Sequence, residues 1–208
     1  MDVIWLRRSG RARCVVVIFG GWAIGPDVFS TLAGEQDVLF VSDYRTLNGE
    51  LPDLSNYETR ALVAWSFGVA AFAHWQSMRP AIFERTIAIA GSETPVDDLR
   101  GIPTAIFEKT VETLSETSYQ GFLMRCHNKR VAAQAIDIAA RREELIAVRE
   151  RGGAPLWRWD SVLLARQDRI FPLASLQHAF AGRPMPVRLI EAPHACFDQF
   201  ANWDAVLA

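Results

Sequence analysis

The segment Ala61-Leu62-Val63-Ala64-Trp65-Ser66-Phe67-Gly68 decides the fold that this sequence predicts. Its first five residues form a continuous apolar run of the kind found in buried parallel strands, and residues 69–78 follow with a helix-like pattern. A sharp turn between strand and helix lifts a serine hydroxyl above the sheet, where it can act as a nucleophile. The crowded backbone of such a turn needs small residues two positions before and after Ser66, and Ala64 and Gly68 stand there. A serine that simply caps the following helix is the alternative interpretation.

Strand-like runs on both sides of this turn predict an α/β architecture. They cover residues 15–19, 38–41, 86–90, 161–165 and 187–190. Their alternation with helical segments indicates a mostly parallel sheet flanked by helices. No such run occurs from 93 to 159, where the pattern predicts helices over 104–114 and 131–148. A final helix is predicted over 197–207.

A helical insertion between two halves of a parallel sheet is the lid arrangement of many α/β hydrolases. The sequence therefore predicts an α/β-hydrolase fold in one domain, with a core formed by 1–92 and 160–208 and a helical lid insertion over 93–159. A chain of 208 residues, half of them apolar, is ordinary for a single globular domain.

Charge and cysteine content narrow the class of protein. The formal net charge of −2 gives no overall attraction to nucleic acid or to an anionic membrane. Cys14, Cys126 and Cys196 are too far apart to suggest a disulfide framework or a metal site. No apolar stretch reaches the ~18 residues of a membrane-spanning helix, and the first ten residues are too polar for a signal peptide. We expect a soluble, cytoplasmic protein without nucleic-acid or membrane partners.

The loop after the first strand-like run is the expected partner of the serine turn. Acyl transfer builds negative charge on a carbonyl oxygen, and two backbone N–H groups usually stabilise it. We expect these oxyanion-hole donors to be the N–H of Phe67, next to the nucleophile, and the N–H of Trp22. Gly20 and Gly21 would allow the close backbone approach. A plain Gly-Gly turn between strand and helix is the alternative.

Ser66 needs a general base, and His194 is the histidine whose position fits. The triad residues of this fold occur in the order Ser, acid, His, so only His178 and His194 come late enough among the four histidines. His194 follows the last strand-like run in a loop, where active groups gather in open α/β sheets, whereas His178 lies in a predicted helix. A helix-capping or surface role is the alternative for His194.

Asp168 is the expected acid. It follows the predicted strand 161–165, and its carboxylate would accept the other ring N–H of His194 and stabilise the imidazolium. The alternative is a surface ion pair with the neighbouring Arg166 or Arg169, which would have little energetic value.

Taken together, the sequence resembles the BioG-type pimeloyl-acyl-carrier-protein methyl ester esterases of the α/β-hydrolase superfamily. The elbow Trp65-Ser66-Phe67-Gly68 and the segment Gly101-Ile102-Pro103, which opens the insertion, are the more specific similarities. The resemblance extends over nearly the whole chain, through segments 19–22, 42–45, 91–96 and 107–110 and the loops of Asp168 and His194.

The resemblance implies an activity and a partner. The activity is hydrolysis of the methyl ester of a pimeloyl group on an acyl-carrier protein, in biotin synthesis. Ser66 would attack the ester carbonyl, and His194 would take its proton, protonate the departing methanol and then activate water. The implied reaction uses no metal and no redox cofactor.

The insertion contains a basic stretch that would suit an acidic carrier protein. Between 125 and 151 there are seven basic and four acidic side chains. The carrier-binding candidates are Arg130, Arg141, Arg142, Arg149 and Arg151. A helical wheel does not gather them on one face, so a solvated helix surface is the alternative.

Two other functions remain open from the sequence. The same three residues would serve a general carboxylesterase or thioesterase that acts on small free esters. A hydrolase-fold protein that binds a ligand without turnover is the second possibility, although a pure binder has no need for Ser66, Asp168 and His194 together.

Overall fold

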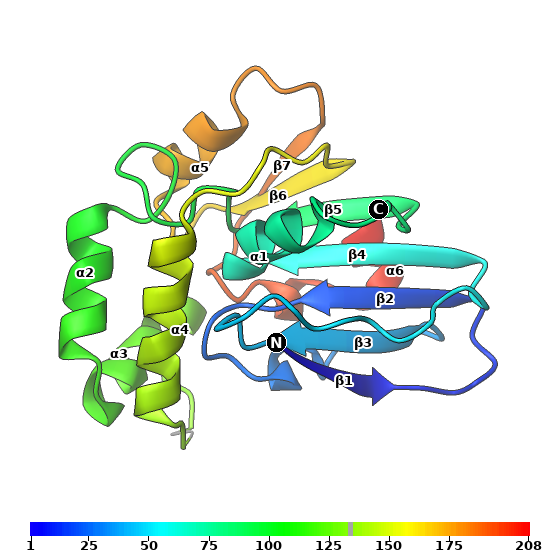
Figure 1. Ribbon diagram of the computed structural model, residues 1–208, viewed down its shortest axis with the longest axis horizontal. Coiled ribbons are helices and arrows are strands. Elements are labelled where there is room, and N and C mark those ends of the chain that lie inside the picture. Colours follow the sequence, from blue (N-terminus) through cyan, green and yellow to red (C-terminus); the bar gives the residue numbers. More distant parts are fainter. Residues whose placement is uncertain (133–134) are drawn as a thin grey trace.

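A single seven-stranded sheet organises the described part of the chain (Figure 1). The computed structural model describes residues 1–132 and 135–208. The strand order is β1-β3-β2-β4-β5-β6-β7, and only β1 runs antiparallel to its neighbour. The strands are β1 Asp2–Arg7, β2 Cys14–Phe19, β3 Asp37–Ser42, β4 Thr59–Trp65, β5 Arg85–Ile89, β6 Ser161–Ala165 and β7 Val187–Ile190.

The central strands are buried on both faces, as continuous β-branched runs require. β2 and β4 pair in parallel, with Phe19 opposite Ala64, and β4 pairs with β5, with Trp65 opposite Ile89. In Figure 1 the helix α1 (Phe67–Gln76) lies in front of the sheet and the short α6 (Trp203–Leu207) behind it. The register places the carboxyl ends of these strands, and the loops that follow them, at one edge of the sheet.

Three helices lie at this edge (Figure 1). They are α2 (Thr104–Thr113), α3 (Glu116–His127) and α4 (Ile138–Arg151), all within the predicted insertion between β5 and β6. The arrowheads of β2, β3 and β4 point toward them in Figure 1. Within 1–132 and 135–208, no helix has both the length and the apolar character needed to cross a membrane.

All six predicted strands are confirmed, but β1 escaped prediction. It contains the apolar run Val3-Ile4-Trp5-Leu6, which was not assigned to a strand, and as an edge strand it has only exposed and partly buried residues. The helix predicted over 104–114 is confirmed as α2, and that over 69–78 is α1, which begins two residues earlier.

Two predicted helices have other bounds in the structure, and one helix was not predicted. The helix predicted over 131–148 begins only at Ile138, where the Asp137 side chain caps it by accepting from the N–H of Ala140 at 3.0 Å; residues 133–134 lie outside the described residues. α3 was not predicted. The final predicted helix, 197–207, is two pieces, a 3-10 turn Phe197–Gln199 and α6, because Asn202 starts a new helix with its own side-chain cap.

Candidate active site

Ser66 occupies a strained turn between β4 and α1. Its backbone has φ 59° and ψ −126°, a region that residues other than glycine rarely adopt. Two glycines make room for this turn. A Cβ on Gly68 would lie 2.0 Å from the carbonyl oxygen of Phe19, and one on Gly91 would lie 2.2 Å from the carbonyl oxygen of Ser66. Gly68 was expected, whereas the role of Gly91 was missed, although it ends a strand-like run.

The structure brings Ser66, His194 and Asp168 together from the loops after β4, β7 and β6. His194 Nε2 lies 3.0 Å from Ser66 Oγ, and His194 Nδ1 lies 2.7 Å from Asp168 Oδ2. The side chains of His194 and Asp168 are 1% and 0% exposed. The carboxylate holds the proton on Nδ1, which leaves Nε2 to accept the serine proton. The arrangement can therefore activate a hydroxyl nucleophile.

Neighbouring groups fix the orientations of the Asp168 carboxylate and the His194 imidazole. Asp168 Oδ1 accepts the backbone N–H groups of Ile170 at 2.7 Å and Phe171 at 2.9 Å. The Phe171 ring stacks on the His194 imidazole, with centroids 6.0 Å apart, and the Trp65 indole donates to the His194 carbonyl at 3.1 Å.

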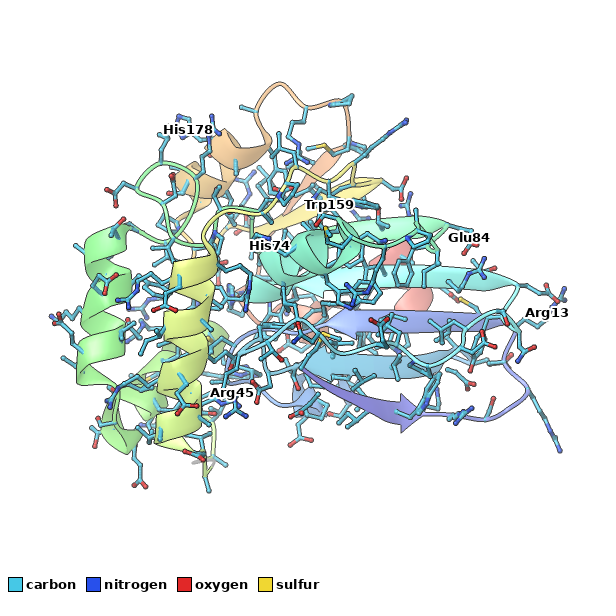
Figure 2. All side chains as sticks on the ribbon, viewed as in Figure 1. Arg13, Arg45, His74, Glu84, Trp159 and His178 are labelled. Carbon is cyan, nitrogen blue, oxygen red and sulfur yellow. The ribbon has the colours of Figure 1, made fainter. Side chains whose placement is uncertain are left out.

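The competing candidates lie elsewhere. His178 is exposed on α5 (Leu173–Phe180), at the outer side of the molecule in Figure 2. Arg166 forms an ion pair with Glu191 at 2.9 Å, and the carboxylate of Asp168 is bonded to His194 instead. The surface-ion-pair interpretation of Asp168 is therefore wrong.

The Gly20–Trp22 loop lies directly against the nucleophile. A Cβ on Gly21 would meet the Cβ of Ser66 at 3.3 Å, so glycine permits the close approach. Phe67 is the first residue of α1, and the first N–H groups of a helix have no partner within it. The backbone N–H groups of Trp22 and Phe67 thus belong to the two segments that flank Ser66, as an oxyanion hole requires.

Three side chains hold this loop. The Tyr44 hydroxyl donates to the carbonyl oxygen of Gly20 at 2.9 Å and shares its proton with that of Val41 at 3.1 Å. The Trp22 indole donates to the carbonyl oxygen of Arg141 in α4 at 3.0 Å, and the Tyr119 hydroxyl of α3 donates to that of Ala23 at 2.8 Å. Two of the three contacts come from the insertion, so the insertion shapes the loop as well as covering it.

A buried polar cluster joins α4 to the turn after β3. Glu144 accepts the backbone N–H of Tyr44 at 2.8 Å and a bond from Arg141 at 2.6 Å, and Arg141 also reaches Asp43 at 3.1 Å. Burial raises the pKa of Glu144 to about 6, against the opposing charge of Arg141. Burial alone would also raise the pKa of Asp43, but hydrogen bonds from Arg45 and the nearby arginine charges lower it to about 2. Figure 2 shows Arg45 beside α4.

Three of the arginines predicted to dock a carrier protein, Arg141, Arg142 and Arg151, have hydrogen-bond partners within the protein. Arg142 donates to the carbonyl oxygens of Val111 and Leu114 at 3.0 and 2.6 Å, which ties α4 to the end of α2. Arg151 donates to the Tyr44 carbonyl at 2.7 Å. These hydrogen bonds tie the guanidinium groups to neighbouring segments, and carrier binding by these arginines stays a prediction.

The two remaining carrier-binding candidates are more accessible. The Arg149 side chain is 38% exposed and pairs with Glu108 at 2.8 Å. Arg130 is exposed just beyond α3. For these two arginines carrier binding stays a prediction.

A pocket opens beside Ser66 beneath the three inserted helices. It measures about 500 Å³, part of it open to solvent. Most of its walls are apolar, with Arg125 and Arg169 as its charged members. The lining residues are Trp22, Ser66, Phe67, Ile102, Ile106, Phe107, Thr110, Phe122, Arg125, Leu145, Arg169 and Ile170. Its apolar walls favour an apolar group beside the Ser66 hydroxyl.

One family model and two curated relatives match most of this chain. A model of the family described as pimeloyl-ACP methyl esterase BioG matches residues 1–206. A malonyl-[acyl-carrier protein] O-methyltransferase of Bacteroides fragilis is 34% identical over 176 residues, which are 79% of this chain but only 36% of that protein. An uncharacterized protein of Haemophilus influenzae is 31% identical over 205 residues, covering 92% of this chain and 93% of its own.

Solved structures confirm the fold. The crystal structure of BioG from Haemophilus influenzae is 28% identical and superposes with a TM-score of 0.89 over all of both chains. The hydrolase BphD from Rhodococcus, 16% identical, has a TM-score of 0.62 over 94% of this chain and 88% of its own, which shows the fold alone. The predicted α/β-hydrolase fold is thus confirmed. The family match over nearly the whole length establishes that the chain belongs to the BioG family of pimeloyl-ACP methyl esterases.

Proposed function

We propose that this chain is a serine carboxylesterase that hydrolyses the methyl ester of a pimeloyl group carried by an acyl-carrier protein in the cytoplasm. The observation that carries the proposal is the hydrogen-bonded chain from Asp168 through His194 to Ser66, which opens onto an apolar pocket in a member of the BioG family. A pocket of this kind suits a linear acyl chain better than a polar substrate.

The mechanism follows from the geometry. Ser66 Oγ attacks the ester carbonyl while its proton passes to His194 Nε2, 3.0 Å away. The backbone N–H groups of Trp22 and Phe67 stabilise the oxyanion of the tetrahedral intermediate. The intermediate expels methanol, which takes the proton from His194, and leaves an acyl group on Ser66. Water then gives a proton to His194 and attacks the acyl group, and the collapse of the second intermediate returns the serine and the free carboxylate.

The name of the Bacteroides relative is compatible with this proposal. An O-methyltransferase that acts on a carrier-bound acyl group makes methyl esters of the class that an esterase would cleave. The match covers 36% of that protein, so its name describes a much longer chain.

The test is mass spectrometry of a methyl-pimeloyl carrier protein incubated with the enzyme. We expect loss of the methyl group with the pimeloyl chain still attached, and a decrease in rate of ~10⁴-fold in Ser66→Ala. The matched control is Ser77→Ala, which removes an exposed serine at the other end of α1. Release of the whole pimeloyl group would indicate a thioesterase, and near-wild-type hydrolysis by folded Ser66→Ala would refute the assignment.

A fluorophosphonate probe separates an enzyme from a protein that only binds its ligand. We expect the probe to label Ser66 in the wild-type chain and to leave Ser66→Ala unlabelled, because only an activated serine reacts. A folded wild-type chain that resists the probe would favour a binding protein.

A further inference from the structure

The pocket beside Ser66 has two cationic side chains among its apolar walls, Arg125 at the end of α3 and Arg169 in the loop after β6. Neither has a role in the mechanism proposed above. An uncompensated positive charge in a mostly apolar pocket is a common means of recognising a negatively charged group.

Both arginines lack an acidic partner within 1–132 and 135–208: no ion pair or side-chain hydrogen bond joins either of them to another residue there. Basic residues close to them in the sequence do have acidic partners. Arg166, in the same loop as Arg169, pairs with Glu191 at 2.9 Å, and Lys129, just beyond α3, pairs with Asp198 at 3.4 Å. The charges that face the pocket are therefore the ones left available for a ligand.

The end of α3, which contains Arg125, and the loop after β6, which contains Arg169, lie against each other and form one rim of the pocket. The Asn128 side chain, just after α3, donates to the carbonyl oxygen of Gln167 in the loop after β6 at 2.9 Å. The N–H of Ala195, next to the base, donates to the carbonyl oxygen of Cys126 at 2.9 Å. These bonds hold the end of α3 against the loops of Asp168 and His194.

Among the described residues, Asp168 forms no ion pair or hydrogen bond with Arg125 or Arg169. Its Oδ2 is bonded to His194, and its Oδ1 accepts two backbone N–H groups. The scissile methyl ester is itself uncharged, and its oxyanion is served by backbone donors. An anion bound by the rim must therefore come from another part of the substrate.

We propose that Arg125 and Arg169 form a subsite for an oxyanion, a carboxylate or a phosphate, at the end of the acyl group remote from the ester. The inference rests on the proposed esterase function and names a substrate class for the same site. A carboxylate would be supplied by a free half-ester of a dicarboxylic acid, and a phosphate by the phosphopantetheine arm through which a carrier holds its acyl group.

Two substrate pairs test the subsite and separate its two sources. Monomethyl and dimethyl pimelate differ in one carboxylate, and methyl-pimeloyl-phosphopantetheine and methyl-pimeloyl-pantetheine differ in one phosphate. We expect kcat/KM to be about tenfold higher for the anionic member of at least one pair, mainly through KM, which corresponds to about 1.4 kcal/mol. The pair that shows the preference identifies the anion.

Variants of the two arginines test whether they cause the preference for the anionic substrate. In Arg125→Gln with Arg169→Gln the anionic-to-neutral ratio should fall toward one, whereas the control Arg166→Gln should keep the wild-type ratio. Equal rates within both pairs, or a preference that survives the double variant, would overturn the subsite.

The proposed esterase chemistry fails in a different way, because no member of either substrate pair would then lose its methyl group. Calorimetric binding of monomethyl and dimethyl pimelate to Ser66→Ala gives the same comparison without turnover. Tighter binding of the charged ester would support the subsite, and equal binding would overturn it.

Discussion

Tyr44→Phe tests whether the position of the Gly20–Trp22 loop, which contains the proposed oxyanion donor Trp22, depends on a residue outside the pocket lining. The substitution keeps the aromatic ring, which stacks on Phe19 with centroids 6.3 Å apart, and removes only the hydroxyl. Burial raises the pKa of Tyr44 well above its usual value, so the hydroxyl stays protonated and donates to Gly20 at every working pH. Its loss leaves the buried carbonyl oxygen of Gly20 without this donor.

Two magnitudes follow from this change. A buried carbonyl left without a partner costs about 1–3 kcal/mol, so the free energy of unfolding should fall by that amount. Removal of a whole oxyanion donor typically costs about 10²–10³ in kcat. Because Tyr44 only positions the loop that carries the Trp22 N–H, we expect a smaller decrease in kcat, about 10–100-fold, with KM within about twofold.

The assay combines steady-state kinetics on a small methyl ester, urea denaturation and the inhibition constant of a boronic acid that mimics the tetrahedral intermediate. The control is Tyr57→Phe, which removes a 2.7 Å hydrogen bond to Asp37 at the start of β3, the opposite end of that strand from the loops. Both variants should lose stability, but only Tyr44→Phe should lose kcat and boronate affinity in parallel. An unchanged kcat in Tyr44→Phe, or equal kcat losses in both variants, would refute the positioning role.

Three further predictions concern the base, the elbow and the buried carboxyl group. His194→Ala should lower kcat/KM by ~10⁴-fold while His178→Ala changes it little, and the reverse result would move the base to α5. Gly91→Ala places a Cβ 2.2 Å from the backbone of the nucleophile and should lower both the melting temperature and kcat, in contrast to Gly25→Ala, where the Cβ meets open space; equal melting temperatures would contradict the elbow geometry. Because the folded-state pKa of Glu144, about 6, lies above its ordinary 4.5, wild type should gain up to about 2 kcal/mol over Glu144→Gln as pH falls from 7 to 4.5, and lose it as pH rises through 6. Urea denaturation of both proteins across this range measures the difference, which a pH-independent result would contradict.

The sequence by itself determined the sheet and the composition of the candidate triad. Short apolar runs rich in β-branched residues are typical of buried parallel strands, and the six predicted runs locate every strand of the sheet except the edge strand β1. The carboxyl ends of parallel strands meet at one edge. The loops that contain Ser66, Asp168 and His194 therefore had to converge, which made the three residues predictable from their order alone.

Only the tertiary structure decided what the arginines of the insertion do. Arg141, Arg142 and Arg151 have the same spacing that a solvated or docking helix would have, and apart from Glu144, three residues from Arg141, their partners lie 28 to 107 residues away. Periodicity along a helix reports which residues share a face, and it cannot report what packs against that face. The same limit applies to Tyr44 and Glu144, whose contact across 100 residues exists only because α4 lies over the end of β3.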